Sequence, residues 1–131
     1  MTELEFYLFT SLLVLPTLYQ RTKLLLNPSS FDKMTWLRRK TGLNLHHGHL
    51  GYVMMAISII LLVLGVHNWI SIGLGGAGLS LSLDEIPPMF KMPSPGRYVE
   101  MSVYKGTTIV ALLTVCLVFE VFSIAFELSS G

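Results

Sequence analysis

The sequence predicts an all-α membrane protein, a bundle of four transmembrane helices with a short amphipathic helix at the membrane interface. Of its 131 residues, 52% are hydrophobic and 13% are charged, whereas about a quarter of the residues of an average soluble domain are charged. The charges lie almost wholly between long apolar runs, and the mean hydropathy is +0.62. These observations indicate a single integral membrane domain over residues 1–131. A net charge of +1 provides no basic face for nucleic acid.

The first predicted span covers residues 4–26. A spanning helix needs about 20 mostly apolar residues, and this segment reaches that length only if the helix continues past Pro16. Proline removes one backbone hydrogen bond, which membrane helices tolerate where neighbouring groups satisfy the freed carbonyl. We therefore expect one span that is kinked at Pro16.

A short amphipathic helix is predicted at residues 30–41. A serine pair can cap its start and a glycine suits its end, while apolar side chains recur every three residues at Phe31, Met34 and Leu37. The bases of its last turn would face anionic lipid headgroups on the cytoplasmic side. We interpret this helix as an anchor between the first and second spans, with lipid sensing as the alternative.

Two further spans, residues 45–66 and 69–86, are separated only by residues 67–68. Helices joined by so short a turn are antiparallel neighbours. Residues equally far from the turn then lie at the same depth, which places Leu50 opposite Glu85.

Small residues on these two spans predict close helix packing. In the third span Gly73, Ala77 and Ser80 follow the spacing i, i+4, i+7 and therefore share one helix face. Such a face lets membrane helices approach closely. Gly48 and Gly51, at the start of the second span, are expected to supply the matching hollow.

The fourth predicted span covers residues 107–128, and the single cysteine within it, Cys116, is interpreted as a packing residue. All nine Lys and Arg residues, Arg21 among them, are assigned to the loops that follow the first and third spans. Four spans place these two loops on one side of the membrane, and short basic loops stay in the cytoplasm. The sequence therefore predicts a multi-pass protein of a prokaryotic plasma membrane with both termini on the outer side.

Five candidate metal ligands lie at one end of the predicted hairpin: His46, His47, His49, Asp84 and Glu85. His46 and His49 share a helix face at i, i+3, whereas His47 points about 100° away, so His46 and His49 with Asp84 are favoured. Imidazoles and carboxylates suit a divalent metal such as zinc, which can activate water for hydrolysis. The alternative is a metal-free polar cluster that pairs internally. Bis-histidine haem is disfavoured, because the fourth histidine lies at the opposite end of the span.

A second candidate is Glu120, a carboxylate deep inside the fourth span. An intramembrane acid indicates a proton relay, an ion ligand or a contact with another subunit. The alternative is a protonated side chain that is hydrogen-bonded to Thr10, Ser11 or Ser58 of a neighbouring helix. Because no base of this chain is expected at that depth, a charged Glu120 would need a partner from another subunit.

The motifs HHGHLGY and GLGGAGLSLSLDEIP resemble those of a loose group of small, uncharacterised prokaryotic four-span membrane proteins. These have a His-His/Gly helix entry and a glycine-rich helix exit that ends in LDE. The likeness covers about residues 43–104. It implies that His46, His47, Asp84 and Glu85 are the polar residues shared within the group, and it attaches no activity to them.

Three hypotheses for function follow from these features. The first is a small, non-catalytic subunit or assembly partner of a larger membrane complex, which would contact the lipid bilayer and other membrane subunits. The second is a metal-dependent membrane hydrolase that uses the histidine and carboxylate cluster. The third is a self-associating channel or transporter with Glu120 in its pathway. Fold-level features alone do not decide between them.

Overall fold

The computed structural model describes residues 2–27, 47–90 and 101–130 of the chain. These ranges form five helices, α1 Glu3–Leu26, α3 His47–Val63, α4 Trp69–Phe90, α5 Met101–Gly106 and α6 Thr108–Ser130. The described part of the chain contains no strand, which confirms the predicted all-α class. The amphipathic helix predicted at residues 30–41 lies outside the described residues.

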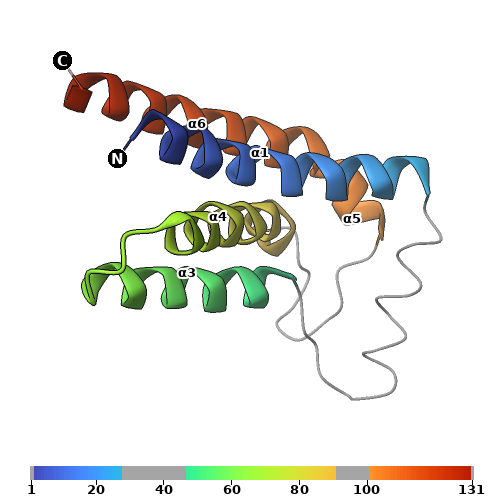
Figure 1. Ribbon diagram of the computed structural model, residues 1–131. Helices are drawn as coiled ribbons and strands as arrows, with labels where there is room; N and C mark the ends of the chain where they lie inside the picture. The colour runs from blue at the N-terminus through green and yellow to red at the C-terminus, as the bar shows by residue number, and fades with distance from the viewer. Residues whose placement is uncertain (1, 28–46, 91–100, 131) are drawn as a thin grey trace.

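The four long helices run side by side (Figure 1). α1 and α6 lie next to each other, and α4 lies between them and α3. α1 and α4 point the same way, while α3 and α6 run in the opposite direction. The turn between α3 and α4 therefore lies at the same end of the bundle as both chain termini.

α1 begins with a capping box. The Thr2 hydroxyl accepts a hydrogen bond from the Glu5 amide at 3.3 Å, and the Glu5 carboxylate accepts one from the Thr2 amide at 2.8 Å. These reciprocal bonds satisfy two donors that a helix start otherwise leaves unpaired. The helix then continues through Pro16 to Leu26, as the length argument requires. Arg21 is therefore part of this helix, and its assignment to a loop was wrong.

The connection between α3 and α4 is longer than the predicted two-residue turn. α3 ends at Val63 and α4 begins at Trp69, because Gly65 adopts a φ of 77°. The amides of Gly65 and Val66 return to the carbonyls of Leu62 and Leu61 at 3.0 and 2.9 Å, which is the Schellman arrangement that ends a helix.

Asn68 caps the start of α4. Its side-chain oxygen accepts from the amides of Ile70 and Ser71 at 3.0 and 3.1 Å. The longer connection shifts the pairing of the two helices, so that Gly48 rather than Leu50 lies against Glu85.

Glycines bring α3 and α4 into backbone contact. A Cβ added to Gly51 would lie 2.6 Å from the Gly78 carbonyl oxygen, and one added to Gly48 would lie 2.6 Å from the Glu85 side chain. Only glycine fits at such distances, so the two residues permit the close approach. A hydrogen bond also joins the two helices: the Ser58 hydroxyl donates to the Ser71 carbonyl at 2.6 Å.

The small-residue face predicted on the third span packs against α1, on the side of α4 away from Gly48 and Gly51. Gly73 lies against Leu12, Ser80 bonds to Thr17, and Ala77 between them is half-buried. The two sets of small residues therefore serve two different interfaces of α4. α4 packs against α1 on one side and against α3 on the other, so close approach requires small residues at both interfaces.

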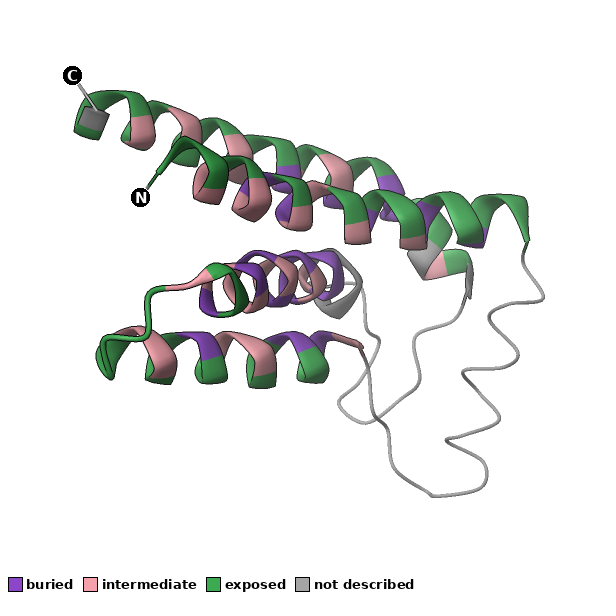
Figure 2. Cartoon of the chain, in the orientation of Figure 1, coloured by how far each residue is buried: buried purple, intermediate pink, exposed green. Residues whose placement is uncertain are grey.

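The buried residues lie where the helices face one another (Figure 2), and more of the buried side chains are polar or charged than apolar. The buried polar and charged residues are Thr10, Thr17, Arg21, Ser58, Ser71, Ser80, Ser82, Asp84, Glu85, Thr107 and Thr108. The buried apolar residues are Leu13, Leu24, Leu83, Ala111 and Val115. Large apolar side chains are exposed along α1, α3 and α6 instead. Among the described residues one helical segment, Thr108–Ser129, is long and apolar enough to cross a membrane.

Candidate functional site

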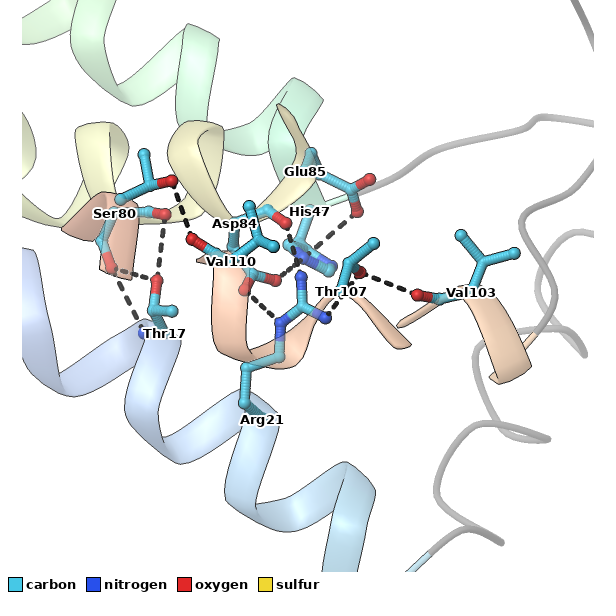
Figure 3. A network of polar contacts seen from close by, with 10 residues as sticks. Thr17, Arg21, His47, Ser80, Asp84, Glu85, Val103, Thr107 and Val110 are labelled. Carbon is cyan, nitrogen blue, oxygen red and sulfur yellow. Dashed lines mark hydrogen bonds and ion pairs between the residues drawn. The ribbon is translucent and has the colours of Figure 1, made fainter. Parts of the chain in front are cut away.

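A buried ion pair links α1 to α4. Arg21 Nε donates to Asp84 Oδ1 at 2.5 Å, and Arg21 Nη2 donates to the Asp84 backbone carbonyl at 2.7 Å (Figure 3). Each of the two side chains is only 2% exposed. Arg21 Nη1 also lies 3.4 Å from Thr107 Oγ1, next to the start of α6. The guanidinium thus contacts α4 and the residue that lies between α5 and α6.

A second polar contact lies one helical turn away. The hydroxyls of Thr17 and Ser80 are 2.9 Å apart, and the Thr17 hydroxyl also donates to the Ser80 carbonyl at 3.2 Å. Thr17 precedes Arg21 by four residues, as Ser80 precedes Asp84. The parallel direction of α1 and α4 therefore puts both pairs in register, one turn apart.

His47, the first residue of α3, joins the cluster from the other side of α4. Its Nε2 lies 2.8 Å from Asp84 Oδ2 and 3.1 Å from Glu85 Oε1. Carboxylate oxygens only accept hydrogen bonds when ionised, so Nε2 carries the hydrogen and donates. Asp84 is consequently held by Arg21 on one oxygen and by His47 on the other.

The charges of this cluster balance. With both carboxylates ionised and His47 protonated, Arg21, His47, Asp84 and Glu85 carry two positive and two negative charges. A buried charge is costly unless an opposite charge and hydrogen bonds compensate it. The arrangement places acids and bases next to each other, and it connects α1, α3 and α4 at one end of the bundle.

The predicted metal ligands come together only in part. His47, Asp84 and Glu85 meet, whereas His49 is exposed and His46 lies outside the described residues. The preference for His49 over His47 was therefore wrong. With about 100° between successive residues, His49 lies on nearly the opposite side of α3 from His47.

A metal ion has no ready place in this arrangement. Within residues 2–27, 47–90 and 101–130, no three His, Cys, Asp or Glu side chains form a group that could hold a metal ion. Both oxygens of Asp84 already accept hydrogen bonds, and the adjacent guanidinium of Arg21 repels a second cation.

Arg21 is the residue that the sequence argument missed. A signal for it exists in the spacing of the residues of α1. The polar residues Thr10, Thr17 and Arg21 lie at i, i+7 and i+11, which matches the spacing of Gly73, Ser80 and Asp84. Two helices with the same spacing of small and polar residues can pair along their whole length.

Glu120 lies on the outer side of α6, away from this cluster, and it is exposed. Two of its three predicted hydrogen-bond partners are engaged elsewhere: Thr10 donates to the Phe6 carbonyl at 2.8 Å, and Ser58 donates to the Ser71 carbonyl. Cys116, one turn before Glu120, is exposed as well, so its predicted packing role within the bundle was wrong.

α1, α3 and α4 thus meet in a buried polar cluster, whereas Glu120 and Glu127 are exposed on α6. The resemblance noted for residues 43–104 stays a prediction. Comparison of the chain with models of known families, with curated proteins and with solved structures gives no match.

Proposed function

We propose that the chain is a four-span membrane protein that serves as a small, non-catalytic subunit or assembly partner of a larger membrane complex. One observation carries the proposal: Glu120 is exposed on the outer face of the helix that is long and apolar enough to cross a membrane. An acidic side chain in contact with lipid hydrocarbon is unfavourable, and such residues almost always face protein or water. A helix of another chain that covers Glu120 removes it from lipid.

The distribution of polar and apolar side chains supports the four-span arrangement. Soluble monomers rarely expose large contiguous apolar surfaces, yet α3 exposes Leu50, Val53, Ile57 and Ile60 while its inward side carries glycine and serine. Lipid would cover the exposed side chains. The end of α1, the start of α3 and the end of α4 lie at the end of the bundle opposite the termini, and residues 28–46 and 91–100 follow or precede them in the sequence. Their basic residues favour a cytoplasmic position for that end, with the termini outside.

The buried cluster supports a non-catalytic role. Arg21 and His47 both bond to Asp84, and His47 also lies 3.1 Å from Glu85 Oε1. A catalytic acid or base must reach a reacting group on a substrate, whereas these groups bond to each other at exposures of 15% or less. The cluster thus holds α1, α3 and α4 together.

A channel or transporter built from several copies of this chain is the second candidate. The exposed Glu120 side chain supports it as well. Self-association would also cover Glu120 and could place it along a pathway. Removal of the carboxylate in Glu120→Gln would then change ion flux. The metal-dependent hydrolase draws no comparable support, because Arg21 competes with a cation for Asp84.

Purification from native membranes in a mild detergent, followed by native mass spectrometry and elemental analysis, tests the proposal. We expect the chain in a fixed ratio with other membrane polypeptides and without stoichiometric metal. A lone, stable monomer would contradict it. A complex of this chain alone would favour the channel, and one zinc per chain would favour the hydrolase.

A further inference from the structure

We propose that the outer seam of α6 binds a transmembrane helix of another subunit that carries a lysine or arginine at the depth of Glu120. The outer seam is defined as Val110, Leu113, Leu117, Glu120, Ile124 and Glu127. This inference rests on the proposed function and adds the chemistry of the partner.

The outer seam has the spacing of a helix-pairing surface. Its residues alternate steps of three and four, as the a and d positions of a heptad do, and every one of them is exposed. Such a seam follows one side of a helix over several turns and fits a second helix that crosses at a shallow angle. The outer seam of α6 thus has the pattern of a surface that pairs with a helix.

The opposite side of α6 already packs on the bundle. Ala111 and Val115 are buried there. Phe122 lies 4.8 Å from Phe9 between ring centroids, and Phe126 stacks on Phe6 at 4.4 Å. α6 therefore uses one side within the chain and presents the other outward.

No base described in this chain reaches Glu120. The contact of Phe122 with Phe9 puts Glu120 level with the first half of α1, while Thr107 lies at the level of Arg21 in the second half. From Thr107 to Glu120 the helix rises by about 20 Å, at about 1.5 Å per residue. Arg21 is in addition bound to Asp84.

Charge complementarity decides the occupant of the outer seam. A second copy in a symmetric contact would place its own Glu120 near this one, and like charges at close range disfavour ionisation of both. A lysine or arginine from a different chain would form an ion pair with Glu120 and satisfy both charges inside the membrane. The outer seam therefore selects a basic helix.

A synthetic helix tests this inference with the full-length chain in phosphatidylcholine vesicles. The probe has about 20 leucine and alanine residues, enough to span the bilayer, with one central lysine. A cysteine four residues before or after the lysine, in two versions, covers both helix directions. Cys116, the only cysteine of the chain, is exposed one turn from Glu120 and reports contact as a disulfide under mild oxidation by copper–phenanthroline.

The lysine probe is expected to give about five- to thirty-fold more disulfide than the same peptide with a central leucine, in line with polar contacts between membrane helices. Glu120→Gln should abolish the difference, and Glu127→Gln, two turns nearer the end of α6, should retain it. With Glu120→Lys, a probe with a central glutamate should give more disulfide than the lysine probe. Circular dichroism checks that each variant is folded.

Equal yields with the lysine and leucine probes would overturn the inference. A disulfide-linked pair of this chain that excludes the lysine probe and is lost in Glu120→Gln would also overturn it and identify a second copy as the occupant. This outcome is distinguishable from a failure of the proposed function. If native partners still co-purify with Glu120→Gln, the subunit role stands and the basic helix at Glu120 is ruled out.

Discussion

The guanidinium of Arg21 donates to both the carboxylate and the backbone carbonyl of Asp84, so that one side chain of α1 holds two separate groups of α4. The second oxygen of the same carboxylate accepts from His47 of α3. Asp84 is therefore the central residue of a contact among three helices. Its bonds connect α1, α3 and α4 at one end of the bundle.

Removal of Arg21 should destabilise the chain strongly. We expect Arg21→Met to lower the free energy of unfolding by about 3–5 kcal/mol, the usual cost of removing one partner of a buried ion pair. Titration with sodium dodecyl sulfate in mixed micelles, followed by circular dichroism, measures this. Lys23→Met is the matched control, because Lys23 is an exposed base on the same helix and should change stability little.

The double variant Arg21→Met, Asp84→Leu provides a second measurement on the same pair. Replacement of both partners by apolar side chains is often neutral, so stability should return toward that of the wild type. If Arg21→Met and Lys23→Met unfold at the same detergent fraction as the wild type, the ion pair does not stabilise the bundle.

His47 and His49 should behave differently. His47→Ala removes the donor that Asp84 and Glu85 share and should lower the free energy of unfolding by about 1–3 kcal/mol. His49 is exposed, so His49→Ala should have little effect. Hydrogen exchange at the start of α3 gives a local readout, with loss of protection expected only in His47→Ala. Equal loss in both variants would contradict the side-chain directions described for α3.

Part of this architecture could be predicted from the sequence. The apolar runs and the spacing of glycines predict the helices and their close packing, and the hairpin predicts that histidine and acids meet at one end. The choice of His47 over His49 depends on the rotation of α3 about its axis. That rotation and the helix register follow from the connection at Gly65, where the backbone departs from helical geometry.

Arg21 illustrates a different limit. Sequence patterns assign a base after an apolar run to a loop, because an isolated charge within the membrane is costly. Arg21 nevertheless lies within a helix, because Asp84, far away in the sequence, compensates its charge. The matching spacing of polar residues on α1 and α4 is a signal for the pair, and the packing of α1 on α4 shows that Arg21 and Asp84 bond.

The contact between Gly51 and Gly78 allows a steric test. We expect Gly51→Ala to lower the free energy of unfolding by about 1–3 kcal/mol, as extra methyl groups in packed interiors do, because its Cβ would lie 2.6 Å from a backbone oxygen. Gly106→Ala is the control, since a Cβ there has no neighbour within 4 Å. The same detergent titration measures both. Unchanged stability of Gly51→Ala would show that α3 and α4 are farther apart than described.

Glu120 should show the opposite behaviour to Arg21. In the isolated chain Glu120→Gln removes a charge that no described residue compensates, so the free energy of unfolding should stay the same or rise. On the proposed placement of Glu120 inside the membrane, the same variant should lose partner polypeptides that Glu127→Gln retains, because a carboxylate within the membrane needs a partner of opposite charge. Quantitative mass spectrometry of the purified complexes, beside the detergent titration, measures both effects. A Glu120→Gln chain that is destabilised by itself would assign Glu120 to the interior of the fold and remove the basis for an interface on α6.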